Sequence, residues 1–133
     1  MSAAPAPESK ALVSVLLVDD EAALLQSMRL SLQREFDIDL ASSAAEADLM
    51  MATKEYAVVV CDHLMPGEEG LQFLIRASER YPGTRRILIT GYMNPELLTR
   101  SMEIARLSSV LLKPIKPGEI SAAINKATKP ANE

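Results

Sequence analysis

The amino-acid sequence predicts an α/β fold in which five strands and five helices alternate along the chain as (βα)5. Short runs rich in Val, Leu and Ile alternate with longer stretches whose apolar residues have helical spacing. Three of the short runs are apolar enough to be buried on both faces, as strands of parallel sheets are. Because strand–helix alternation implies right-handed crossovers, we expect a doubly wound, parallel five-stranded sheet with helices on both faces.

The five expected strands are the apolar runs at residues 13–18, 36–40, 57–61, 86–89 and 109–112. Each run has a length that is usual for a strand in a globular protein. In a parallel sheet the carboxyl ends of the strands lie at one edge, where the functional residues of such folds gather. The residues that follow each strand are therefore the first candidates for a functional site.

The stretches after the strands carry apolar residues three and four positions apart, which is typical of one face of a helix. In chain order these residues are Leu25, Met28 and Leu32; Ala47, Met50 and Met51; Leu71, Leu74 and Ile75; Leu98, Met102 and Ala105; and Ile120, Ala123, Ile124 and Ala127. The fourth stretch has a second apolar face, made of Leu97, Ile104 and Leu107. Only one of its two faces can pack on the sheet, so the other is either a partner surface or additional core.

The chain of 133 residues has the size of one domain. Residues 11–128 form the expected folded domain, since residues 1–10 and 129–133 lack a hydrophobic pattern and are expected to be disordered tails. A net charge of −4 and a pI near 5.1 argue against a nucleic-acid-binding surface. No segment has the composition of a signal peptide or a membrane span, so we expect a cytoplasmic protein without membrane contact.

Charged and hydroxyl side chains stand directly after four of the expected strands. Asp19 and Asp20 follow the first strand, Asp62 the third, Thr90 the fourth and Lys113 the fifth. If these strands are neighbours, three carboxylates meet at one edge, and like charges this close favour a bound cation. Oxygen ligands without a His or Cys cluster indicate Mg2+ or a similar hard ion rather than zinc.

Some of these residues also have structural interpretations. Asp19 or Asp20 stands where a helix N-cap is expected, although capping does not explain both of them together with Asp62. Asp62 begins a segment rich in turn residues, and Thr90 with its following glycine is equally compatible with a turn and with a functional role. Cys61, the single cysteine, is interpreted as a small buried residue in preference to a redox sensor.

The order and spacing of these motifs resemble the receiver family of bacterial two-component response regulators, in particular its single-domain, chemotaxis-regulator-like members. The resemblance is carried by residues 17–21 (LVDDE), 62–67 (DHLMPG) with Gly70, 90–91 (TG) and 113–114 (KP), and it extends over essentially the whole folded part. It implies the flavodoxin-like receiver fold and phosphorylation of Asp62 by a histidine kinase. The chain would then be a phosphoryl acceptor in signal transduction, with at most slow autodephosphorylation, and not an enzyme.

The resemblance also implies a role for each residue of the site. Asp62 would be the nucleophile that becomes an aspartyl phosphate. Mg2+ would be held by Asp62, Asp20, the backbone carbonyl of Leu64 and, through water, Asp19. Lys113 would pair with one phosphoryl oxygen, and the hydroxyl of Thr90 would move to another.

Partners follow from the resemblance as well. The phosphoryl donor would be a sensor histidine kinase or a phosphotransfer protein, and a downstream protein target would bind the face made by the fourth helix, fifth strand and fifth helix. The same face would serve a phosphorylation-dependent homodimer. The chain departs from the family at Val110, where many receivers have an aromatic residue that reports phosphorylation. Tyr92, two residues after Thr90, is expected to take over that role.

Two other functions are compatible with this fold. A pseudo-receiver would act as a phosphate-independent protein-interaction module, but it would be free to lose some of the site residues, all of which are present. A Mg2+-dependent phosphatase with an aspartyl nucleophile would need an Asp-x-Asp strand end, where this chain has Asp19, Asp20 and Glu21. The sequence is also compatible with a fragment of a longer regulator.

Overall fold

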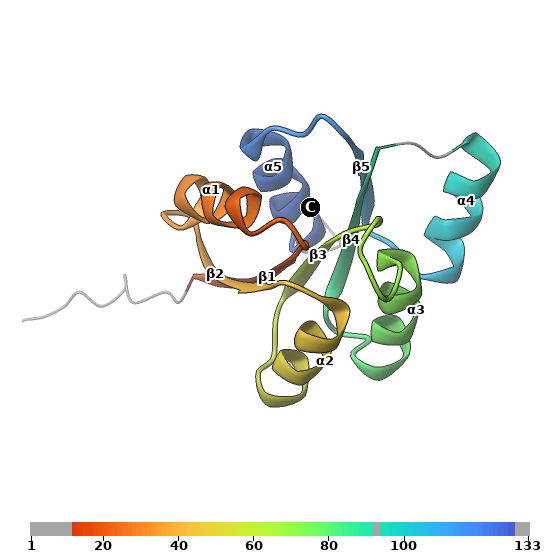
Figure 1. The fold of residues 1–133 in the computed structure, drawn as a ribbon, viewed down its shortest axis with the longest axis horizontal. Helices are drawn as coiled ribbons and strands as arrows, with labels where there is room; N and C mark the ends of the chain where they lie inside the picture. The colour runs from red at the N-terminus through yellow and green to blue at the C-terminus, as the bar shows by residue number, and fades with distance from the viewer. Residues whose placement is uncertain (1–11, 92–93, 130–133) are drawn as a thin grey trace, which may run out of the picture.

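The computed structural model of the chain describes residues 12–91 and 94–129, which form one parallel sheet covered by helices on both faces (Figure 1). In chain order the elements are β1 (Val13–Val18), α1 (Ala22–Leu32), β2 (Phe36–Ala41), α2 (Ala44–Thr53), β3 (Val58–Asp62), α3 (Gly70–Arg80), β4 (Arg85–Thr90), α4 (Pro95–Ile104), β5 (Ser109–Leu112) and α5 (Pro117–Ala127). The predicted (βα)5 fold class is confirmed. Residues 1–10 and 130–133 of the predicted tails, and Tyr92, lie outside the described residues.

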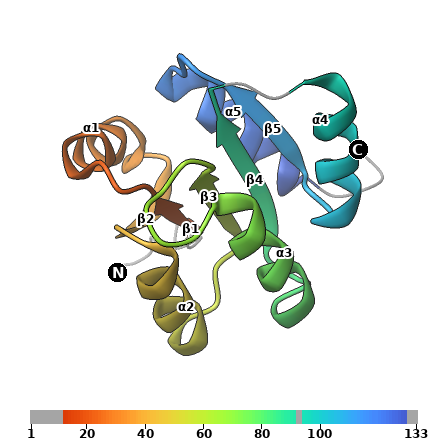
Figure 2. The ribbon, with the colours of Figure 1, turned by 45° about the vertical axis from the view of Figure 1, so that its right-hand side comes forward.

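The strand order in the sheet is β2-β1-β3-β4-β5, and all neighbouring strands are parallel. The chain therefore moves outward from β1 to β2 and then returns to the other side of β1 for β3. Such a reversal opens a crevice at the carboxyl ends of the two central strands, which is where ligands of doubly wound folds bind. β1 and β3 end at this point (Figure 2).

The two faces of the sheet bury separate apolar clusters, because successive side chains of a strand point to opposite faces. Val15 and Leu17 of β1 lie in a cluster with α1 and α5, whereas Leu16 and Val18 lie in a cluster with α2, α3 and the end of α4. Figure 1 shows α1 and α5 together on one side of the sheet and α2 and α3 on the other. In the part of the chain that the structure describes, no helix is long and apolar enough to span a membrane.

The strand predictions are correct to within one residue at each end, while one helix buries a different face than predicted. In α3 the residues in the core are Phe73, Leu74 and Ala77. Leu71 and Ile75, which the apolar spacing assigned to the core face, are only partly buried at its margin. Phe73 is the largest fully buried side chain among the described residues, which is consistent with burial of this side of the helix.

The two apolar faces of α4 have different fates. Leu98 is partly buried, Met102 packs partly buried against the core, and Leu107, just after the helix, is buried in the core. Leu97 and Ile104 are 50% and 52% exposed. The second apolar face of α4 is therefore divided: Leu107 is part of the core, whereas Leu97 and Ile104 lie on the surface.

The C-terminal end of α4 is a Schellman motif with an arginine in the left-handed position. Arg106 has a φ of 51°, its N–H donates to the carbonyl of Glu103 at 3.3 Å, and the N–H of Leu107 donates to the carbonyl of Met102 at 2.9 Å. Glycine is the usual residue here, because a Cβ makes the left-handed conformation unfavourable by roughly 1–2 kcal/mol. The turn is therefore formed at some cost in stability.

The buried side chain of Arg86 in β4 holds this turn. Arg86 is 5% exposed. Its guanidinium donates from Nε to the carbonyl of Ala105 at 2.9 Å and from a terminal nitrogen to the carbonyl of Arg106 at 3.1 Å. Another terminal nitrogen donates to the carbonyl of Thr84. Burial lowers the pKa of Arg86, and the charges of Arg85 and Arg106 lower it further. The guanidinium of Arg86 thus connects the end of α4 to β4 through hydrogen bonds to uncharged backbone carbonyls.

We expect Arg106→Gly to raise the free energy of unfolding by about 0.5–1 kcal/mol. The substitution removes the strained Cβ and one positive charge near Arg86, and it leaves the carbonyl that Arg86 binds in place. Urea unfolding followed by circular dichroism measures the change. Arg106→Ala is the control, since it removes the same charge but keeps the Cβ; an equal gain in both variants would show that backbone strain is not the cause.

Candidate functional site

Three carboxylates meet at the carboxyl edge of the sheet, where β1 and β3 end. Asp19, Asp20 and Asp62 each offer a carboxylate oxygen, and these atoms lie within 4.8 Å of one another. The pairing of Val18 with Cys61 puts the ends of the two strands side by side. Asp19 and Asp62 are buried, and Asp20 is exposed. The cluster is thus open to solvent on one side only.

Burial and repulsion by the neighbouring carboxylates both disfavour the charged form of Asp19 in this cluster. Burial raises the pKa of Asp19 to about 6, and the neighbouring carboxylate of Asp62 raises it as well. The N–H of Glu21 opposes this by donating to Asp19 Oδ1 at 3.0 Å. Oxygen ligands that repel one another around an open side are the donor set that a hard divalent cation prefers. The residues present therefore fit Mg2+.

Lys113 brings a positive charge to the same edge. Its Nζ lies 2.6 Å from Asp62 Oδ1, and this contact is the main reason why the pKa of Lys113 is raised. The backbone N–H of Lys113 donates to the carbonyl of Thr90 at 2.9 Å, which continues the pairing of β5 with β4. The Lys113–Pro114 peptide bond, which follows directly, is cis.

Thr90 and Leu64 flank this group of charges. Thr90 ends β4 and is buried, one position after Ile89, which pairs with Asp62. Leu64 lies in the loop that follows β3, and its side chain is 68% exposed. The structure thus brings the predicted site residues to one edge, whereas Tyr92, expected to replace the usual aromatic reporter, lies outside the described residues.

Gly70 follows the 62–67 segment of the receiver motif, and the structure shows its physical role. It begins α3, and a Cβ built on it would lie 2.1 Å from the backbone carbonyl oxygen of Asp62. No side chain fits there, because the nearest atoms are backbone. Gly70 therefore lets α3 start in direct contact with the end of β3 and fixes the loop between them.

Residues next to the cluster have structural roles of their own. Cys61 is fully buried, and burial raises the pKa of its thiol, as expected of a small core residue. The N-cap of α1 is Glu21, not Asp19 or Asp20. Asp19 does accept a backbone N–H in this turn, so it has a local structural contact in addition to its place in the cluster.

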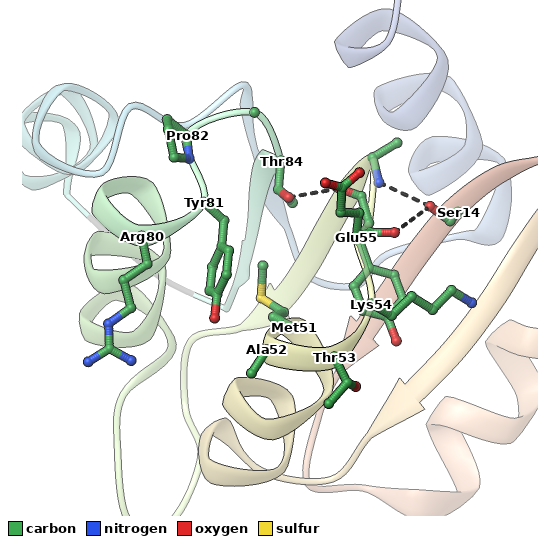
Figure 3. A pocket seen from close by; sticks show the side chains of 13 residues that line it. Ser14, Met51, Ala52, Thr53, Lys54, Glu55, Arg80, Tyr81, Pro82 and Thr84 are labelled. Atoms are coloured by element: carbon green, nitrogen blue, oxygen red, sulfur yellow. Dashed lines mark hydrogen bonds between the residues drawn. The ribbon is translucent and has the colours of Figure 1, made fainter.

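A cavity of about 780 Å³ lies at the opposite edge of the sheet (Figure 3). It opens between the end of α2 and the loop that joins α3 to β4, with Lys54, Tyr81 and Thr84 among its lining residues. None of the predicted site residues lines it. The chemistry of the carboxyl edge therefore does not extend to this cavity.

The fold and the site together define the class of protein: a doubly wound α/β domain with a carboxylate cluster and a lysine at the carboxyl edge of its sheet. Residues 15–125 match the family described as response regulator receiver domain. The chain belongs to this family and is the receiver domain of a two-component response regulator.

Relatives of known name are consistent with this assignment. The hydrogenase transcriptional regulatory protein HoxA of Cupriavidus necator is 34% identical over 116 residues, which are 87% of this chain and 24% of that protein. The acid tolerance regulatory protein ActR of Rhizobium meliloti is 30% identical, with 84% of this chain and 57% of that protein covered. The chain thus spans between a quarter and about half of these relatives.

Solved structures show the same fold. The signal receiver domain of an HD domain-containing protein from Pseudomonas fluorescens Pf-5 superimposes with a TM-score of 0.80 at 27% identity, over 87% of this chain and 94% of that one. The chemotaxis protein CheY4 of Vibrio cholerae has a TM-score of 0.81 at 22% identity, over 88% and 99% of the two chains. At this identity the second similarity concerns the fold alone.

Proposed function

We propose that the chain is a phosphoryl-accepting switch in which Asp62 is the residue that is phosphorylated. The observation that carries the proposal is the grouping of the Asp19, Asp20 and Asp62 carboxylates within 4.8 Å, with Lys113 Nζ 2.6 Å from Asp62. A carboxylate can act as a nucleophile toward a phosphoryl group when nearby cations offset the repulsion between the two anions. The donor is a histidine kinase or a phosphotransfer protein.

In the proposed reaction a carboxylate oxygen of Asp62 attacks the phosphorus of a phosphohistidine. The new O–P bond forms as the P–N bond breaks, and the imidazole of the donor leaves. Mg2+ bound by Asp19, Asp20, Asp62 and the backbone carbonyl of Leu64 would supply charge stabilisation. Lys113 exchanges its contact with the Asp62 carboxylate for one with a phosphoryl oxygen, and Thr90 contacts another.

The product differs from the free carboxylate by a group of about −1.5 to −2 charge with three strong acceptors. Lys113 and Thr90 lie at the ends of β5 and β4, next to the segments that lead into α5 and α4. A shift of these strand ends is the proposed route from the site to the surface of α4, β5 and α5. This surface would bind a downstream protein or a second phosphorylated copy.

We place the reaction in the cytoplasm and regard the chain as a substrate of its kinase in preference to an enzyme. The expected absence of nucleic-acid contact applies to this chain only. Since the relative HoxA is named a hydrogenase transcriptional regulatory protein, a longer protein that contains such a domain could act in transcription.

The proposal is tested by incubating the wild-type chain with acetyl phosphate, with Mg2+ or with a chelator, and measuring intact mass. We expect one added phosphoryl group with Mg2+ and little or none with chelator. Amide NMR spectra with beryllofluoride should show shifted signals for Thr90 and α4. If neither reagent has an effect, the chain is a phosphate-independent interaction module, as a pseudo-receiver would be.

A prediction concerns the exposed apolar residues of α4. Exchanging both Leu97 and Ile104 for Ser is expected to weaken phosphorylation-dependent assembly while changing the free energy of unfolding by less than about 1 kcal/mol, because both side chains are half exposed. Sedimentation velocity with and without beryllofluoride measures assembly. Leu49→Ser in α2, where the leucine is 71% exposed, is the matched control. Unchanged assembly of the double variant would contradict this role of α4.

A further inference from the structure

Three charged side chains outside the phosphorylation site form a compact ionic cluster beside it. Arg76 of α3 contacts Glu68 with two nitrogens, at 2.6 and 2.9 Å, and contacts Asp48 of α2 at 2.6 Å. The guanidinium also lies 5.7 Å from the ring of Phe73. This Arg76 cluster joins two helices to the loop that follows β3.

The Arg76 cluster has the geometry in which even a partly exposed ion pair stabilises the local structure. Isolated surface pairs are worth little, but a two-pronged contact between arginine and carboxylate within a network of charges is an exception. The Arg76 hydrogen bonds lower the pKa of Glu68 below its usual range, so the Glu68 carboxylate stays ionised and paired. The side chain of Arg76 is 28% exposed and is held on one side by the aromatic ring.

Glu68 belongs to the loop between Asp62 and Gly70, which also carries Leu64. The inner part of this loop is fixed by backbone hydrogen bonds, from His63 to the carbonyl of Ile89 and from Gly70 to the carbonyl of His63, both at 2.8 Å. Its outer part turns at Gly67, whose φ is 91°. Among the described side chains of the loop, Glu68 is the one with ion-pair contacts to both α3 and, through Arg76, α2.

We propose that Arg76 is a positioning residue for the metal site: by holding Glu68, it keeps the loop in the conformation in which the Leu64 backbone can contribute to Mg2+ binding. This inference rests on the proposed function, because it concerns the cation that the carboxylate cluster would bind. Among the described contacts, Arg76 has none with Asp19, Asp20 or Asp62. Its effect on the site is transmitted through Glu68 and the loop backbone.

Arg76→Met tests the proposal because geometry and charge predict opposite results. Removing a positive charge near a cation site should strengthen Mg2+ binding if only electrostatics changes. The positioning role predicts weaker binding, with the Mg2+ dissociation constant raised about tenfold, the lower range for residues that support a metal ligand. Arg76→Lys keeps the charge and loses the two-pronged contact, so its Mg2+ dissociation constant should lie between those of the wild type and Arg76→Met. Titration of the unphosphorylated protein with MgCl2, followed by amide NMR shifts, gives the constants.

Two further variants complete the test. Arg80→Met removes the same charge from α3 at a residue without a described ion pair, and it should leave Mg2+ binding unchanged or slightly tighter. Thermal unfolding without Mg2+ shows whether each variant is folded. If Arg76→Met does not fold, the positioning role is tested by Arg76→Lys alone. Unchanged or tighter binding in both Arg76 variants would overturn the positioning role and leave the proposed function intact. A wild-type chain that does not bind Mg2+ would overturn the proposed function itself.

Discussion

Asp62→Asn is expected to abolish phosphoryl incorporation from acetyl phosphate, with the fold preserved. An amide has nearly the same shape as the carboxylate but is not a nucleophile toward phosphorus. The other carboxylates of the cluster are not expected to substitute, because only Asp62 is in contact with Lys113 among the described ion pairs. Intact mass measured after incubation with acetyl phosphate and Mg2+ should show no added phosphoryl group, and beryllofluoride should leave the amide spectrum unchanged.

Asp20→Asn separates loss of the nucleophile from loss of the metal site. Asp20 is the exposed member of the cluster, and its replacement removes one proposed Mg2+ ligand but leaves the Asp62–Lys113 pair in place. Phosphorylation of this variant should be slow and should recover in part at high Mg2+ concentration. Phosphoryl incorporation by Asp62→Asn at the wild-type level would show that another residue is modified.

The strands could be predicted from the sequence because their apolar runs match their burial. Their ends were less accurate, since hydrophobicity does not report backbone pairing. The third strand was expected to end at Cys61, before a charged residue, but the ladder continues through Asp62, which pairs with Ile89. The fourth strand likewise extends by one residue at each end, to Arg85 and Thr90.

The residues of the site could be predicted from their places after strands, but the distances between them could not. Which strands are neighbours in the sheet depends on pairing between segments far apart in the sequence, and the pattern of a single strand does not show it. The expected strand neighbours came from the resemblance to receivers. Lys113 follows β5 and Asp62 ends β3, and their 2.6 Å contact spans the end of β4, which lies between these strands. The Arg76 cluster and the burial of Arg86 were missed, because an arginine in the sequence gives no pattern from which its partners or its burial can be inferred.

Gly70→Ala is expected to impair both stability and phosphorylation. The added Cβ would lie 2.1 Å from the carbonyl oxygen of Asp62 and 3.0 Å from the Cα of His63, and both atoms belong to the backbone. Relief requires α3 to move away from the end of β3, since no flexible side chain can give way. Overpacking of this kind costs about 1–3 kcal/mol, and occasionally more.

The same movement would displace the backbone that carries Asp62 and the loop with Leu64. We therefore expect Gly70→Ala to slow phosphorylation by acetyl phosphate at least about tenfold, even at temperatures where the protein is fully folded. Urea unfolding measures the first effect and intact mass against time the second. Gly83→Ala is the control, because a Cβ at Gly83 meets no atom within 4 Å and its φ is not positive. A Gly70→Ala protein with wild-type stability and phosphorylation rate would mean that α3 can shift without moving the site, and the close contact would then have no functional role.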